Sequence, residues 1–233
     1  MNDVIIACDF GSKEDCLNFL KQFEILENKP FLKIGMELFY AAGPEIVKEL
    51  KKQGFRIFLD LKLHDIPNTV KKAMKVLSDL DVDMVNVHAS GTVEMMKAAK
   101  DGLTREDGSR PLLIAVTQLT STSEKAMQEQ LLISSSINDT IIKYAQNAKE
   151  AGLDGVVCSP LEAGMVKQAC GKDFLTITPG IRFKDSSKDD QVRITDPAGA
   201  REIGSDFIVV GRPITASEKP VEAYNRCLRD FLG

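Results

Sequence analysis

The chain has 233 residues, of which 43% are hydrophobic and 27% charged, so it can bury one full-sized core and matches the usual length of a single barrel domain. Its formal net charge of -4 argues against the basic surface typical of a nucleic-acid-binding protein. Its five scattered cysteines lack metal-site spacing, no apolar run approaches a membrane span, and the N-terminus lacks a signal-peptide pattern. We therefore expect a cytoplasmic protein that binds neither membrane nor nucleic acid.

Short β-rich runs alternate with amphipathic helical patterns along the chain. We expect eight strands, at residues 4–8, 31–34, 56–61, 84–87, 112–116, 155–158, 175–177 and 207–210. The helical patterns cover residues 13–23, 44–53, 69–80, 92–102, 138–151, 161–170, 198–203 and 218–231.

This alternation predicts a parallel sheet, because each strand is followed by a helix that returns the chain to the same edge. Eight such units in a chain of this length favour an α/β fold, a single-domain (β/α)8 TIM barrel over residues 1–233. An open, doubly wound sheet is the alternative. The absence of a Gly-x-Gly-x-x-Gly turn after the first strand weighs against a dinucleotide-binding fold of that kind.

Charged residues end the first three expected strands. Asp9 follows the first, Lys33 lies near the end of the second, and Asp60 and Lys62 end the third, with Asp65 three residues later. An isolated Asp-x-Lys pair is most often an ordinary salt bridge, with the second Asp capping the next helix. Ionisable groups at three strand ends favour a built site instead, because burying charges is costly unless they are closely paired.

The third strand is expected to place Phe58, Asp60 and Lys62 on one face, because side chains alternate along a strand. Opposite charges a few ångströms apart favour the ionised form of each partner, so a buried Lys62 can remain an ammonium group and act as a proton donor. Fixed cations of this kind suit a reaction that generates negative charge on carbon, with no metal or organic cofactor.

Two connections are unusually long for a barrel, residues 119–137 and 179–193, and long loops often bind ligands or act as lids. The second is polar and charged, and Arg182 and Gln191 flank it. A solvated loop explains most of its charges, but residues at its anchored ends could still reach a ligand.

The segment after the eighth strand predicts a phosphate site. Gly211 permits close backbone approach and Arg212 offers a bidentate fork, at a position where barrels commonly bind phosphate. Arg182 and Gln191 are expected opposite. A polar cluster after the fifth strand could bond a heterocycle: Thr117, Gln118, Thr120 and Ser121. For His64 and His88 we expect structural roles, since no second His or Cys stands at metal-ligand spacing.

Together these motifs closely resemble the orotidine 5'-phosphate decarboxylase family of the bacterial type. The resemblance spans nearly the whole chain and is carried by Asp9, Lys33, Asp60-x-Lys62-x-x-Asp65-Ile-Pro-Asn-Thr69, Leu119-Thr120-Ser121, Thr178-Pro-Gly-Ile-Arg182, Gln191 and Gly211-Arg212-Pro-Ile-Thr215. It implies a homodimeric, cofactor-free barrel, without a metal site, that converts orotidine 5'-phosphate to uridine 5'-phosphate and carbon dioxide in the last step of pyrimidine nucleotide synthesis.

The resemblance also implies roles for single residues. Lys62 would protonate C6, and Asp60 would crowd the substrate carboxylate and hold Lys62. The remaining implied roles are the ribose for Lys33 and Asp9, the pyrimidine for Thr120, the phosphate for Arg182, Gln191, Gly211 and Arg212, and the neighbouring subunit's site for Asp65 and Thr69. Lys62, Asp60, Asp65 and Lys33 would form the catalytic set.

Two alternatives stay open on the sequence. A metal-dependent decarboxylase or aldolase acting on a keto-sugar phosphate could share the Asp-x-Lys-x-x-Asp core, and magnesium dependence would reveal it. A non-catalytic sensor could keep the phosphate site alone, although such a binder has no need of buried, closely spaced charges.

Overall fold

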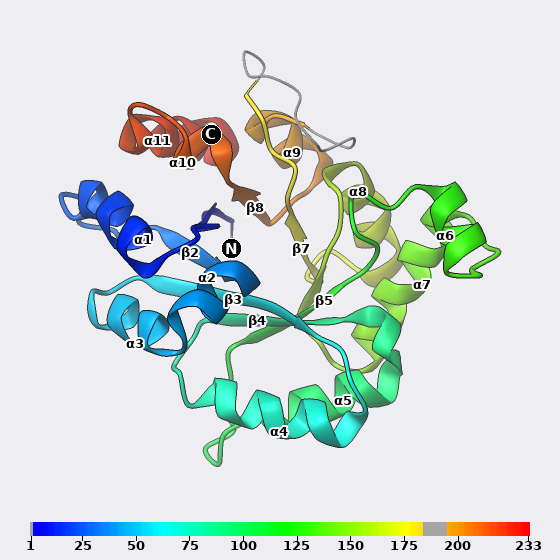
Figure 1. Cartoon of the computed structure of the whole chain (residues 1–233). Coiled ribbons are helices and arrows are strands. Elements are labelled where there is room, and N and C mark those ends of the chain that lie inside the picture. The colour runs from blue at the N-terminus through cyan, green and yellow to red at the C-terminus, as the bar shows by residue number, and fades with distance from the viewer. Residues whose placement is uncertain (1, 184–194) are drawn as a thin grey trace.

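The computed structural model describes residues 2–183 and 195–233, and these form a closed barrel of eight parallel strands in chain order, surrounded by helices (Figure 1). This confirms the expected (β/α)8 architecture. The strands are β1 (Asp3–Ala7), β2 (Phe31–Gly35), β3 (Arg56–Leu63), β4 (Met84–His88), β5 (Leu112–Val116), β6 (Gly155–Val157), β7 (Leu175–Thr178) and β8 (Phe207–Val210).

The helices also match the predicted pattern, with three additions. They are α1 (Lys13–Leu20), α2 (Met36–Ala42), α3 (Glu45–Lys52), α4 (Pro67–Ser78), α5 (Thr92–Leu103), α6 (Glu124–Gln130), α7 (Ile137–Glu150), α8 (Pro160–Cys170), α9 (Pro197–Ile203), α10 (Arg212–Thr215) and α11 (Pro220–Leu232). The sequence did not predict α2, α6 or α10. The expected long loop at 119–137 is therefore partly helical. Ser123 caps the start of α6, where its side chain accepts the N–H of Ala126 at 3.1 Å. In the parts of the chain that the structure describes, no helix is both long and apolar enough to cross a membrane.

Two apolar layers hold the barrel together. The larger lies between the strands and the helices, and the smaller fills the barrel interior. In the interior, Phe31 and Phe207 meet edge to face with ring centroids 6.2 Å apart. On β3, Phe58 points inward while Ile57 and Leu59 point to the helices, as the alternation predicted. The interior is thus packed with side chains, and the polar groups gather above it at the carboxyl ends of the strands.

At the opposite, amino end of the barrel, three aspartates each tie their own strand to the strand before it. The backbone N–H of Asp83 donates to the carbonyl of Ile57 at 2.9 Å, and its carboxylate accepts the N–H of the same residue at 2.7 Å. Asp154 makes the same two bonds with Leu113, and Asp206 makes them with Thr176. We call these three residues, Asp83, Asp154 and Asp206, the amino-end clamps.

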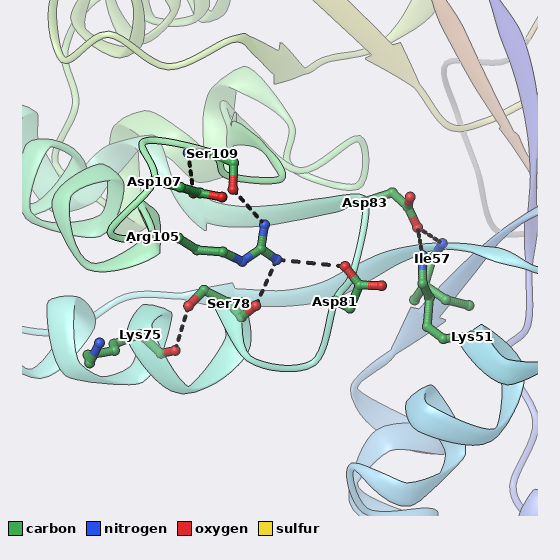
Figure 2. Close-up of polar contacts among 9 residues, drawn as sticks. All are labelled: Lys51, Ile57, Lys75, Ser78, Asp81, Asp83, Arg105, Asp107 and Ser109. Carbon is green, nitrogen blue, oxygen red and sulfur yellow. Dashed lines mark hydrogen bonds and ion pairs between the residues drawn. The ribbon is translucent and has the colours of Figure 1, made fainter.

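Each clamp also pairs with a cation: Lys51 lies 2.8 Å from Asp83, Arg110 2.5 Å from Asp154 and Lys167 2.5 Å from Asp206. Figure 2 shows the first of them, with the Asp83 carboxylate accepting from both Lys51 and the backbone N–H of Ile57. In the same view Arg105 ties the adjoining loops together, donating to the carbonyl of Ser78 at 2.8 Å. These contacts join neighbouring segments at the end of the barrel remote from the charged strand ends, where barrel residues serve stability.

Candidate active site

Of the five charged side chains expected to converge at the strand ends, four meet at the carboxyl ends of β1, β2 and β3, and the fifth, Asp65, does not join them. The Nζ of Lys33 lies 2.7 Å from Oδ1 of Asp9 and 3.4 Å from Oδ2 of Asp60. The Nζ of Lys62 lies 2.6 Å from Oδ1 of Asp60. Asp9, Lys33, Asp60 and Lys62 therefore form one continuous row of alternating charge.

The middle of this row is buried. The side chains of Lys33 and Asp60 are 11% and 10% exposed, whereas that of Asp9 is 56% exposed. Burial by itself lowers the pKa of Lys33, but the charges of Asp60 and Asp9 outweigh it and raise that pKa above its ordinary value. Burial likewise favours a higher pKa for Asp60, yet the charges of Lys33 and Lys62 hold that pKa below its usual range. Both groups are therefore ionised at neutral pH.

The backbone that presents Lys62 departs from a regular strand. Leu59 pairs with Val85 and Leu63 pairs with Val87, so three residues of β3 lie opposite the single residue Asn86. Within this bulge Lys62 has a φ of +52°, in the left-handed region that non-glycine residues seldom adopt. Bulges beside active sites redirect side chains. The strand therefore places Lys62 by an irregularity that strict alternation does not predict.

Asn86 is a site residue that the sequence reasoning missed. It is 1% exposed, its Nδ2 donates to Oδ1 of Asp60 at 2.7 Å, and its Oδ1 accepts the backbone N–H of Lys62 at 2.8 Å. The only signal in the sequence was one polar residue inside the apolar run of β4. That signal could not show which residues of β3 it faces.

A cavity of about 180 Å³ opens beside this row. Lys33, Asp60 and Lys62 line one side of it, and Thr120 lines it too, as expected from the polar cluster after β5. Gln118 also lines the cavity. The rest of the wall is mostly apolar and includes Phe58, Val116, Val157, Ile177 and Val209. An enclosure of this kind suits a flat ring with a few polar edges.

A second cavity of about 480 Å³ adjoins the first and shares Lys33, Pro179 and Val209 with it. It is lined by Asp9 and by the predicted phosphate residues Arg182, Gly211 and Arg212. The structure therefore brings the two arginines, from the segments after β7 and β8, to one hollow. Two guanidinium groups at one site suit an anion.

The segment that carries Arg182 is held in place by local bonds. Ile181 bridges to Thr195, and the N–H of Arg182 donates to the carbonyl of Thr195 at 3.0 Å. Arg182 is buried, with 8% of the residue exposed. Gln191, the other residue expected at this loop, lies outside the described residues. After β8, the short helix α10 begins at Arg212 directly after Gly211.

Asp65 and Thr69 are not part of this cluster. Both are exposed: Asp65 lies just before α4 and Thr69 lies in its first turn. Neither residue lines either cavity. The Oδ1 of Asp65 accepts the N–H of Ile66 at 2.7 Å, and Ile66 itself occupies the N-cap position of α4. The alternative of Asp65 as a helix cap is therefore not what the structure shows.

The two histidines lie next to each other beside the row, with ring centroids 5.8 Å apart. Burial, followed by the charges of His64 and Lys62, lowers the pKa of His88 below its ordinary value of 6.5. His88 is therefore neutral at neutral pH. Neither histidine lines either cavity, and His88 interacts with the row through the charges of Lys62 and Asp60.

The chain matches known proteins in sequence and in fold. Residues 2–227 match the family model described as "Orotidine 5'-phosphate decarboxylase / HUMPS family". The chain is 56% identical over 224 residues to an orotidine 5'-phosphate decarboxylase of Streptococcus thermophilus, covering 96% of this chain and 95% of that protein. It is 52% identical to one from Geobacillus sp., covering 100% and 98%. The crystal structure of orotidine 5'-phosphate decarboxylase from Lactobacillus acidophilus is similar at a TM-score of 0.89 and 40% identity, covering 100% of both chains.

Proposed function

Because the chain belongs to the orotidine 5'-phosphate decarboxylase / HUMPS family, we propose that its two adjoining cavities hold the pyrimidine and the phosphate of one nucleotide, with Lys62 at the reacting carbon. The chain is a carboxy-lyase that converts orotidine 5'-phosphate to uridine 5'-phosphate and carbon dioxide, the last step of pyrimidine nucleotide synthesis. Residues 1–233 then act as one catalytic domain, and we propose a cytoplasmic location.

One observation supports the assignment above all others: the row of alternating charge, buried at Lys33 and Asp60, that ends with the Lys62 ammonium on the wall of the smaller cavity. In the reaction the bond from C6 to the carboxylate carbon breaks, and its electron pair stays on C6. Carbon dioxide leaves, and a proton moves from Nζ of Lys62 to C6. The neutral lysine then regains a proton from water. A cation fixed in advance stabilises the developing carbanion without reorganising.

The other members of the row have supporting roles in this proposal. Asp60 holds the Lys62 ammonium at 2.6 Å and lies close to the substrate carboxylate, where like charge disfavours the bound ground state. Lys33 and Asp9, which line the larger cavity, bind the ribose hydroxyls. Thr120 bonds the pyrimidine ring. The chemistry needs neither metal nor organic cofactor.

The phosphate end supplies binding energy that is used at the ring. Arg182, Gly211 and Arg212 line the larger cavity, and Gln191 completes the phosphate set in this proposal. Interactions with a remote phosphate can be used to orient and desolvate the reacting carbon. The two cavities share Lys33, so the ends of the substrate are coupled through one residue.

We further propose a homodimer in which Asp65 and Thr69 reach the neighbouring subunit's site. Their exposure, together with the 67% exposure of Ile66 between them, supports a covered surface at the start of α4. Dimers with two-fold symmetry place the same segment of both chains at the interface.

The decisive test follows the ultraviolet absorbance of orotidine 5'-phosphate with purified protein in excess chelator, with released carbon dioxide counted in parallel. We expect fast loss of substrate with one carbon dioxide per nucleotide, and almost none with Lys62→Ala. Turnover that requires added magnesium would contradict the cofactor-free mechanism. Full activity of Lys62→Ala would contradict the proton-donor assignment.

A further inference from the structure

We propose that Asn86 is a positioning residue for decarboxylation: it holds the Lys62 backbone and the Asp60 carboxylate so that the Lys62 ammonium is fixed at the reacting carbon. The inference deepens the proposed function and rests on the role of Lys62 given there. Asn86 itself lines neither cavity and is not expected to touch the substrate.

The backbone conformation of Lys62 needs to be stabilised by contacts from other residues. Its φ of +52° lies in a region that costs free energy for a residue with a Cβ, and such conformations persist where surrounding contacts enforce them. The register shift between Leu59 and Leu63 leaves this stretch of β3 without regular pairing to β4. The Oδ1 of Asn86, which accepts the Lys62 N–H at 2.8 Å, supplies a bond at this point.

The same side chain also orients the acid that holds the ammonium. Oδ1 of Asp60 receives both Nδ2 of Asn86 at 2.7 Å and Nζ of Lys62 at 2.6 Å. One amide thus fixes Lys62 at two points, directly through its backbone and indirectly through the carboxylate. An amide both donates and accepts, whereas an ionised carboxylate lacks the donor and an aliphatic side chain lacks both.

A buried polar residue in an apolar strand can also serve the fold alone, so the test must separate the two roles. Asn86→Leu removes both bonds at nearly constant shape. Asn86→Asp keeps the acceptor for the Lys62 N–H but sets a second carboxylate against Asp60. Thr176→Val is the matched control, because it removes a fully buried hydroxyl of β7 at the opposite end of the barrel.

We expect kcat of Asn86→Leu to fall by about 100-fold, as misplacement of a reacting group by about 1 Å does, while KM and the affinity for uridine 5'-phosphate stay near wild type. Thr176→Val should keep its kcat. A variant Asn86→Leu with wild-type kcat, or with a raised KM alone, would overturn the proposal.

The pH profile of Asn86→Asp gives a readout that a purely structural role does not. When protonated, the new carboxyl can donate to Asp60 and accept from Lys62 as the amide does, so kcat relative to wild type should rise as pH falls. The charged and titratable groups around position 86 are Asp60, Lys62, Lys33, His64 and His88, and the ratio to wild type removes the pH dependence that the two enzymes share. A ratio that is flat with pH would overturn the proposal.

These arms also separate this inference from the proposed function. If Lys62→Ala abolishes turnover and both Asn86 variants behave like Thr176→Val, the positioning role alone is wrong. If Lys62→Ala remains active, the proton-donor assignment fails first. Asn86→Asp is close in shape to the native residue and keeps the test usable if Asn86→Leu does not fold.

Discussion

The side chain of Lys33 reaches from β2 to Asp9 beyond the end of β1, and the 2.7 Å contact between them lies directly beside the backbone of Gly35. A Cβ at position 35 would lie 3.0 Å from Oδ1 of Asp9 and 3.1 Å from Nζ of Lys33. The close approach of the two charged groups, and not the backbone conformation, is therefore the reason for a glycine here. A φ of -86° is accessible to any residue.

From this contact we expect Gly35→Ala to separate the Asp9–Lys33 pair and to lower kcat/KM by roughly 10-fold or more, because a catalytic group moves by a few tenths of an ångström or further. The variant should still fold. Gly11→Ala is the control, since its Cβ would meet only Glu37 at an ordinary 3.6 Å. Equal steady-state kinetics for both variants would contradict the requirement for Gly35.

The phosphate assignment predicts a large effect far from the reacting carbon. Arg212→Ala should cost about 1.5–3 kcal/mol of transition-state stabilisation, roughly 10- to 150-fold in kcat/KM, because a charge-assisted hydrogen bond is lost. The exposed Arg229, which lines neither cavity, provides the control Arg229→Ala. Kinetics of Arg212→Ala that match the wild type would rule out this phosphate site.

The proposed dimer predicts complementation between two inactive variants. Co-expressed Asp65→Ala and Lys62→Ala chains form mixed dimers in which one site has an intact Lys62 from one subunit and an intact Asp65 from the other. With random pairing about a quarter of the wild-type activity should return. Mixtures that stay as inactive as the separate variants would show that Asp65 does not act across the interface.

The lowered pKa of His88 predicts a pH-dependent stability. A group whose pKa is lower in the folded state favours the unfolded chain when protonated, so its contribution is complete above pH 6.5 and is lost as pH falls below that value. We expect His88→Gln to lose less stability than the wild type over this acid range. Urea unfolding on both sides of pH 6.5, at one protein concentration, measures the difference; parallel pH curves would contradict it.

The amino-end clamps predict stability effects without catalytic ones. Asp83→Ala removes the acceptor of the Ile57 N–H and the partner of Lys51, and should cost about 1–3 kcal/mol in the free energy of unfolding. The kcat should not change, because Asp83 lies at the far end of the barrel. Chemical denaturation and steady-state kinetics on one preparation check both parts, and a fall in kcat at full folding would contradict the separation.

The sequence predicted all eight strands to within a few residues, because each is a short apolar run between polar segments. It did not predict α2, whose seven residues directly follow β2 at Gly35, or α10, which has only four. Short helices carry too few turns for a clear periodic pattern. The Ser123 cap was a usable signal for α6.

The sequence predicted those site residues that can be recognised from their residue type and their place at a strand end. Charged residues at strand ends identified Asp9, Lys33, Asp60 and Lys62 because burial of charge is unusual. The bulge that presents Lys62, and the place of Asn86 opposite it, depend on strand register. Register is a property of two strands together, so one strand's pattern could not supply it.

The amino-end clamps join some neighbouring strands of the barrel and not others. They tie β4 to β3, β6 to β5 and β8 to β7, whereas β2 follows Pro30, which has no N–H to complete the same pair of bonds. Among the described residues, three of the four consecutive strand pairs are therefore fastened at their amino ends, and the pair of β1 and β2 is not. New chain ends introduced between two clamped pairs leave each aspartate covalently connected to the strand that it holds. Ends placed within a clamped pair remove that covalent connection. Circular permutants of the chain should follow this two-strand spacing in their yield of folded protein.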